Sequence, residues 1–153
     1  MTEDSISISD IAFNSSEARE RIGAEIFETP LIPSLKRGSK LLFKAENFQN
    51  TGSFKIRGAL SKLTALAKAK DLNAFKFITA SSGNHGIACS KAASILGASL
   101  TVVLPETVAK VKLERIKSFG VDVLIQGEES GQAELHAQKM SKEEGYYYIS
   151  PYN

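Results

Sequence analysis

The second half of this sequence repeats one unit, an apolar strand followed by a helix that ends at a glycine. These glycines are Gly97, Gly120 and Gly145, and successive ones lie 23 and 25 residues apart. A glycine is favoured just past a helix because the chain turns there with a positive φ, which residues with a Cβ tolerate poorly. Strands that alternate with helices of this length indicate a parallel sheet with right-handed crossovers. We therefore predict an α/β fold, an open parallel sheet with helices on both faces.

Hydrophobic periodicity places the individual elements. We expect helices at 7–22, 53–70, 84–96, 107–119 and 130–144, and strands at 40–46, 75–79, 100–104, 121–125 and 146–149. Residues 1–6 look frayed, and the polar run 14–16 is a candidate break in the first helix. The proline-flanked run 29–33 is at most an edge strand, because proline cannot donate a ladder hydrogen bond.

Composition excludes several classes of function. The net charge is only +2 and the basic residues are scattered, so we expect neither a nucleic-acid nor a membrane surface. No apolar run approaches the roughly 20 residues that a membrane span needs. The single cysteine, Cys89, and an acidic start without a signal peptide favour the cytoplasm. With one cysteine and two histidines we expect no metal site.

Lys55 occupies an unusual position for a lysine. It lies at the start of the helix expected from Ser53, where Thr51, Gly52 and Ser53 would supply the turn and the N-cap. The positive end of the helix dipole disfavours an ammonium there and so favours the free amine. A partly neutral lysine is a nucleophile that can form a Schiff base. The alternative is a solvated lysine at a fraying helix end.

A second candidate site is the loop Ser81-Ser-Gly-Asn-His-Gly86 between a strand and a helix. Its small residues and the helix N-terminus would gather backbone N–H groups into a cradle for a carboxylate or phosphate. The alternative is a glycine-rich turn with Ser82 as the helix cap. The glycine spacing fits neither a P-loop nor a dinucleotide-binding fingerprint, which weakens a third reading, a nucleotide-binding domain. Both candidate sites follow strands, so we expect them at one edge of the sheet.

Taken together, Gly52-Ser-Phe-Lys-Ile-Arg-Gly-Ala59 and Ser81–Gly86 resemble the threonine/serine dehydratase and serine racemase family of fold-type-II pyridoxal-phosphate enzymes. The resemblance spans nearly the whole chain, to Ile149-Ser-Pro-Tyr-Asn153. It implies a small domain of the tryptophan-synthase-β type at 53–153, with 1–52 as a helix and arm that would belong to the large domain. It also implies pyridoxal 5'-phosphate as the cofactor, a small amino-acid substrate, and a homo-oligomer or a missing C-terminal segment that covers the sheet.

The resemblance also implies a role for each site residue. Lys55 would form the Schiff base and then remove the α-proton of L-threonine or L-serine, in an ammonia-lyase reaction. Phe54 would lie against the cofactor ring, and Asn84 would hydrogen-bond the ring hydroxyl. The substrate carboxylate would be bound by Ser81, Ser82, Gly83 and His85. A serine at position 82 keeps a serine racemase activity open, because in racemases that serine exchanges a proton on the opposite face.

The sequence departs from the family pattern at its end. It stops after the strand at 146–149 and contains no glycine-rich loop for the cofactor phosphate. We therefore expect this to be the N-terminal part of a longer enzyme, with little or no dehydratase activity as 153 residues alone. A non-catalytic module remains the alternative.

Overall fold

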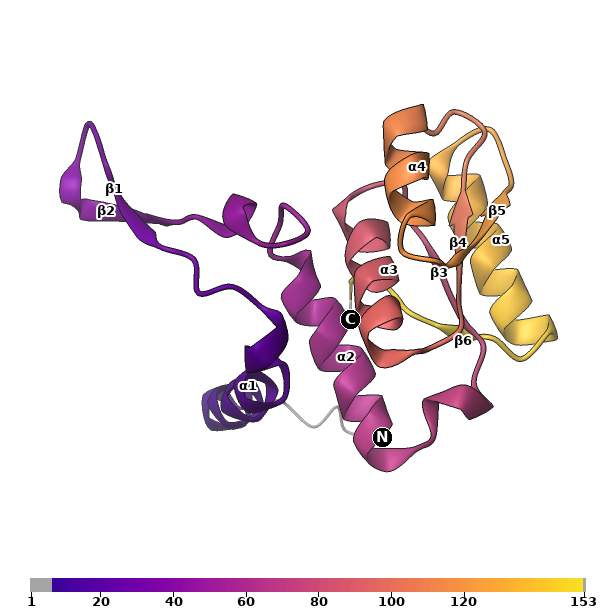
Figure 1. Cartoon of the computed structure of the whole chain (residues 1–153), viewed down its shortest axis with the longest axis horizontal. Helices are drawn as coiled ribbons and strands as arrows, with labels where there is room; N and C mark the ends of the chain where they lie inside the picture. The colour runs from indigo at the N-terminus through magenta and orange to yellow at the C-terminus, as the bar shows by residue number, and fades with distance from the viewer. Residues whose placement is uncertain (1–6, 153) are drawn as a thin grey trace.

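The structure is a computed structural model that describes residues 7–152. The expectation for residues 1–6 falls outside this range, as does Asn153. Residues 55–152 form a layered α/β body, and residues 7–54 form a helix and an extended arm beside it (Figure 1).

The α/β body is built on a four-stranded parallel sheet in the order β5-β4-β3-β6. The strands are β3 (Phe77–Ala80), β4 (Leu100–Leu104), β5 (Asp122–Ile125) and β6 (Tyr147–Tyr148). The fold class predicted from the alternation of strands and helices is confirmed. The predicted strands are also correct in position, although the last one pairs over two residues only.

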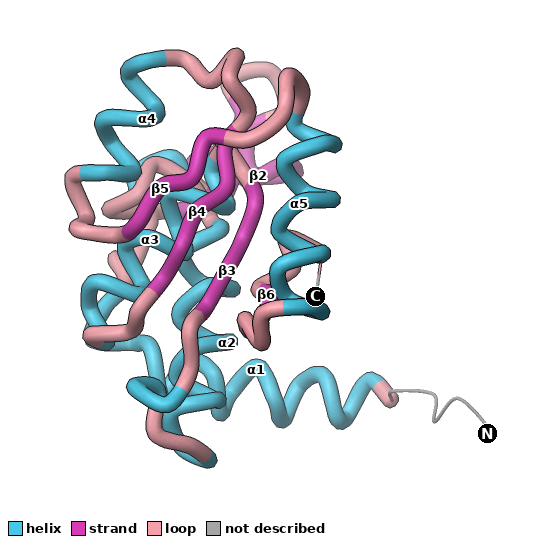
Figure 2. Tube along the Cα trace, turned by 90° about the vertical axis from the view of Figure 1, so that its right-hand side faces the viewer, coloured by secondary structure: helices cyan, strands magenta, loops and turns pink. Residues whose placement is uncertain are grey.

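Helices cover both faces of this sheet. One face carries α5 (Ser130–Glu143), and the other carries α3 (Asn84–Leu96) and α4 (Lys110–Lys117), as Figure 2 shows. A further helix, α2 (Lys55–Ala69), packs on α3. Alternation along β3 explains the two cores, because Phe77 packs among α2 and α3 residues while Ile78 packs among α5 residues.

The three glycines that we predicted at helix ends all have the expected positive φ. Gly97 is the C-cap residue of α3 with φ of +66°, and Gly145 follows the C-cap residue of α5, Glu144, with φ of +76°. Gly120 has φ of +75° and ends a turn that follows α4. Each therefore reverses the chain toward the next strand in a region of φ that favours glycine.

The N-terminal helix α1 (Ile8–Ile22) begins with a capping box, in which Ser7 Oγ accepts from Asp10 N–H and Asp10 accepts from Ser7 N–H. Residues 14–16 do not interrupt it, so the candidate break was wrong. Short 3₁₀ turns follow along the chain at Gly23–Glu25, Glu46–Phe48 and Leu72–Ala74.

The strand expected at 40–46 exists but belongs to a different sheet. As β2 (Gly38–Lys44) it pairs antiparallel with β1 (Leu31–Ser34) in a hairpin that projects from the body (Figure 1). The physical reason is local: a three-residue turn followed by Gly38, with φ of +54°, returns the chain onto its own neighbour. The expectation that Lys55 follows a strand of the parallel sheet was therefore wrong.

Two helix starts also differ from expectation. The helix α2 begins at Lys55 with Phe54 at the N-cap position, and no side chain caps it. The buried Ser53 Oγ has no hydrogen-bond partner in the described part of the chain, so Ser53 is not the cap. The helix α4 begins at Lys110 instead of Thr107, whose hydroxyl donates to the Glu128 carbonyl in the neighbouring loop.

A close approach inside the Ser81–Gly86 loop generates a stability prediction. A Cβ added to Gly86 would lie 1.9 Å from the Ser81 carbonyl oxygen, so the backbone would have to shift. We expect Gly86→Ala to destabilise the fold by about 1–3 kcal/mol. The control is Gly131→Ala, also in a helix, where a Cβ meets nothing within 4 Å. Denaturant unfolding of both variants tests this, and equal stabilities would contradict it.

Candidate active site

Lys55 is anchored by the last residues that the structure describes. It is half-buried, and its Nζ donates a hydrogen bond of 3.0 Å to the carbonyl oxygen of Pro151, 96 residues away in sequence. The Nζ also lies 5.6 Å from the centroid of the Phe54 ring. The alternative of a lysine extended into solvent at a fraying helix end does not describe this structure.

A cavity of about 460 Å³ opens beside the Lys55 side chain. Its walls come from α2, from the start of α3, and from the segment that follows β6. Lining residues are Phe54, Lys55, Gly58, Ala59, Ser61, Lys62, Ala65, His85, Ile149, Ser150, Pro151 and Tyr152. This volume lies within the range of small-molecule sites, which are mostly apolar with a few placed polar groups.

His85 reaches the same cavity from α3 and is buried. Its Nε2 lies 3.1 Å from Thr79 Oγ1, 3.3 Å from the Ile149 carbonyl oxygen and 3.4 Å from Cys89 Sγ. Burial lowers the pKa of His85, and the charge of Lys55 lowers it further, while the bond to the Ile149 carbonyl opposes both. Burial raises the pKa of the Cys89 thiol to about 12, so Cys89 is a packed thiol and not a nucleophile.

The rest of the Ser81–Gly86 loop lies at the N-terminus of α3 but does not line this cavity. Gly83 is the N-cap residue, and its N–H donates to Ser81 Oγ at 3.2 Å. No side chain caps α3, so Ser82 is not its cap. Ser81, Ser82 and Gly83 are partly exposed and Asn84 is exposed. The structure therefore brings Phe54, Lys55 and His85 together, and leaves the loop beside them.

Lys55 and the Ser81–Gly86 loop lie near each other, as expected. Helix packing brings them together, and not a shared edge of the sheet. Since β2 lies outside the parallel sheet, no strand of that sheet carries Lys55 to its carboxyl edge. Instead α2 packs along α3 through buried residues that include Ile56, Leu60 and Ala88. This packing sets the first turn of α2 against the first turn of α3.

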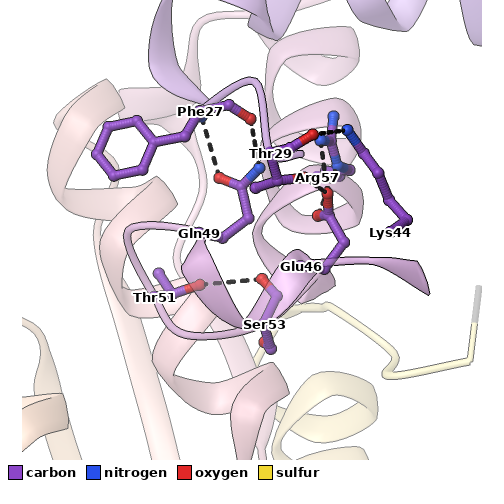
Figure 3. Close-up of polar contacts among 8 residues, drawn as sticks. All are labelled: Phe27, Thr29, Lys44, Glu46, Gln49, Thr51, Ser53 and Arg57. Atoms are coloured by element: carbon purple, nitrogen blue, oxygen red, sulfur yellow. Dashed lines mark hydrogen bonds and ion pairs between the residues drawn. The ribbon is translucent and has the colours of Figure 1, made fainter. Parts of the chain in front are cut away.

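A charged contact fixes the first turn of α2 to the arm. The Arg57 guanidinium donates from Nε to Glu46 Oε2 and from a terminal nitrogen to Glu46 Oε1, both at 2.8 Å (Figure 3). Thr29 Oγ1 donates to the same carboxylate at 2.6 Å, and Lys44 Nζ donates to the Thr29 carbonyl oxygen. The hydrogen bonds from Arg57 lower the pKa of Glu46 to about 2. Bidentate contacts of this kind are strong and directional.

A second contact secures the turn that leads into α2. Gln49 accepts from the Phe27 N–H at 3.1 Å and donates to the Phe27 carbonyl oxygen at 2.7 Å (Figure 3). Gly52, with φ of +78°, then turns the chain toward Lys55. The arm therefore positions the residues on both sides of this turn, although its hairpin stays exposed.

Sequence reasoning missed four contributors to this site: Thr79, Lys62 and the carbonyl oxygens of Ile149 and Pro151. Thr79 has a detectable signal, because it is a hydroxyl residue in an otherwise apolar buried strand just before the loop. The two carbonyls have none, because every residue has a carbonyl and only the fold selects which ones face the site.

The side chains that line the cavity suit the aldehyde and the ring of pyridoxal phosphate. A primary amine can condense with an aldehyde, and an aromatic side chain with small apolar neighbours suits a planar ring. Residues 7–152 contain no group of three side chains that could hold a metal ion. The same residues include no helix with the length and apolarity to span a membrane.

Comparison with known proteins gives consistent results. A family model described as "Pyridoxal-phosphate dependent enzyme" matches residues 22–153. The catabolic L-threonine dehydratase of Staphylococcus aureus is 33% identical over 153 residues, which are 97% of this chain and 42% of the relative.

Solved structures of pyridoxal-phosphate enzymes superpose on this chain. A threonine deaminase of Solanum lycopersicum superposes with a TM-score of 0.82 at 27% identity, covering 95% of this chain and 41% of that one. Maize serine racemase gives 0.79 at 31% identity, covering 91% and 43%. The chain thus spans under half the length of these relatives.

The Glu46–Arg57 contact predicts a pH-dependent contribution to stability. The pKa of Glu46 falls from 4.5 to about 2 on folding, so the stabilisation is complete above pH 4.5 and lost as the pH falls toward 2. We expect Glu46→Gln to cost about 1–3 kcal/mol at pH 7. The difference from the parent should shrink below pH 4.5. Unfolding at pH 7, 5 and 3 measures it, with Glu128→Gln, on an exposed loop, as control. A constant difference would contradict the assignment.

Proposed function

Because this chain belongs to the pyridoxal-phosphate dependent enzyme family, we propose that it is part of an amino-acid dehydratase that acts on L-threonine or L-serine. The products would be a 2-oxo acid and ammonia. The proposal rests on the position of the Lys55 amine, which the Pro151 carbonyl holds at the wall of the cavity. The threonine dehydratase among its relatives supports the substrate class.

Lys55 would have two tasks in this reaction. Its amine would hold the cofactor covalently. As a free amine it would act as the base that takes the proton from the substrate Cα. The cofactor supplies the electron sink that makes this proton acidic enough to remove. Phe54, whose ring lies near the Lys55 amine, would pack on the cofactor ring, and Asn84 would bond its hydroxyl.

The substrate carboxylate would bind at the N-terminus of α3. Backbone N–H groups from Ser81 to His85 lie at the positive end of a 13-residue helix, which favours an anion. The partly exposed Ser81, Ser82 and Gly83 leave this end open to a ligand. A carboxylate held there and an amine on Lys55 would fix the orientation of an amino acid between them.

The wider setting follows from the same proposal. We propose that residues 1–52 pack with a part of the enzyme that is not included in this sequence, and that the complete enzyme is a cytoplasmic homo-oligomer. The exposed apolar side chains of the hairpin, such as Leu41 and Phe43, support this packing, because exposed apolar patches commonly mark interfaces.

A second candidate function is amino-acid racemisation. It is favoured by the hydroxyl of Ser82, a group that could exchange a proton with the substrate Cα, and by the likeness to maize serine racemase. Lys55 would serve one face of the substrate and Ser82 the other. The two functions share the same cofactor and the same first proton transfer.

The test of the main proposal is Lys55→Ala in the full-length gene product. We expect it to abolish the absorbance band of the protein-bound Schiff base, measured after unbound pyridoxal phosphate is removed, and to lower dehydratase activity by at least about 10³-fold. The matched control is Lys62→Ala, because Lys62 lies on the same helix and lines the same cavity. A band that survives Lys55→Ala but disappears in Lys62→Ala would refute the role of Lys55.

The racemase candidate is separated by Ser82→Ala. If Ser82 exchanges the second proton, this variant loses racemisation of serine by about 10²-fold or more while elimination continues. Chiral chromatography of the remaining substrate and a keto-acid assay measure the two rates in one reaction. Equal loss of both rates would show that Ser82 has no face-specific role.

A further inference from the structure

The His85 ring is held by a buried hydrogen-bonded group at the base of the Lys55 cavity. Thr79 is fully buried on β3, and its hydroxyl donates to the Ile149 carbonyl oxygen at 2.8 Å. His85 Nε2 lies within hydrogen-bond distance of both of these oxygens, at 3.1 and 3.3 Å. This nitrogen of the ring therefore faces a threonine hydroxyl and a carbonyl, with the Cys89 thiol beside them at 3.4 Å.

These contacts determine where the proton of His85 lies. A carbonyl oxygen only accepts, and the single hydroxyl proton of Thr79 is already donated to it. If Nε2 had no hydrogen, its lone pair would face a carbonyl lone pair with nothing between them. The carbonyl contact therefore favours the tautomer in which Nε2 carries the hydrogen and Nδ1 has none, with Cys89 Sγ, at 3.4 Å, as a weak acceptor beside it.

This tautomer limits what the His85 side chain can do. Its one N–H is directed to Thr79 and Ile149, and its Nδ1 can only accept a hydrogen bond. A carboxylate also only accepts, so the side chain has nothing to donate to it. Burial and the charge of Lys55 both lower the pKa of His85, which opposes a second proton on the ring.

The same contacts connect His85 to Lys55 through the backbone. Ile149 is fixed on both sides, since its N–H donates to the Ile78 carbonyl at 2.8 Å and its own carbonyl accepts from Thr79 and His85. Two residues further on, the Pro151 carbonyl accepts from Lys55 Nζ at 3.0 Å. The position of the acceptor for the Lys55 amine thus depends on how Ile149 is held.

We propose that His85, together with Thr79, is a positioning residue: as the Nε2–H tautomer it holds the segment 149–151 that places the Lys55 amine, and its side chain does not bind the substrate carboxylate. The inference rests on the proposed function of Lys55. It leaves the carboxylate to the backbone N–H groups of the loop.

The tautomer is measured directly in the unmodified protein without cofactor. Long-range ¹H–¹⁵N correlation spectra distinguish Nε2–H, Nδ1–H and doubly protonated rings. The signals that are missing from the spectrum of the full-length His85→Gln variant identify His85. We expect the Nε2–H pattern at pH 7. An Nδ1–H tautomer or an imidazolium would overturn the proposal, whatever the variants do.

Two substitutions then separate positioning from carboxylate binding. A glutamine amide reaches about as far as Nε2 and restores a donor there, whereas an asparagine amide reaches only the Nδ1 position. We expect His85→Gln to retain the Lys55-dependent absorbance with pyridoxal phosphate, and His85→Asn to weaken cofactor affinity and kcat on the order of tenfold. The KM for the amino acid should change little in either variant. Thermal melting verifies that both fold.

The opposite pattern would refute the positioning role: a raised KM in His85→Gln, with rescue by His85→Asn and an unchanged absorbance band in both. Thr79→Ser, which keeps the hydroxyl, should behave as the parent, and Thr79→Val should resemble His85→Asn. Should neither histidine variant fold, the parent's spectrum decides. A parent with the Nε2–H tautomer but no Lys55-dependent band would refute the proposed function and leave the tautomer assignment intact.

Discussion

The hydrogen bond between Lys55 and the Pro151 carbonyl joins the two ends of the α/β body. Lys55 opens its first helix, and Pro151 follows its last strand. Formation of this contact requires β6 to pair with β3, because only that pairing brings residues 149–151 beside α2 and α3. The site therefore depends on the pairing of β6 with β3, and no single supersecondary unit contains it.

Two further features keep the Lys55 side of this contact in place. The helix α2 has no side-chain cap, so its start is fixed from outside, by packing on α3 and by the bond from Arg57 to Glu46 in the arm. Gly86 allows the first turn of α3 to approach the Ser81 carbonyl more closely than any residue with a Cβ could. Rigid positioning of this kind is what a covalent and general-base role requires of an amine.

The sequence allowed the fold class to be predicted because strand and helix periodicities differ and the helix-ending glycines mark each unit. It did not predict the partner of β2, since periodicity identifies a strand but not its neighbour. It also assigned Ser53 a capping role that the structure does not support, because cap preference is a tendency that tertiary packing overrides. For β2 the missing information was local, in the turn that pairs it with β1, whereas for Ser53 it was non-local.

The sequence also predicted part of the candidate site. The sequence identified Lys55 and His85, and the structure places both at one cavity. It could not identify the carbonyls that orient them, nor distinguish the backbone of the Ser81–Gly86 loop from its side chains. The glycines there were interpreted as a way to expose N–H groups, whereas Gly86 has a steric reason that only the close approach to Ser81 reveals.

The central claim is that Lys55 is the reactive amine. Borohydride reduction of the full-length protein with pyridoxal phosphate, followed by peptide mass spectrometry, tests it most directly, because reduction makes the link to the lysine permanent. We expect the added mass on the peptide that contains Lys55. Labelling of Lys62 or another lysine, with Lys55 unmodified, would contradict it.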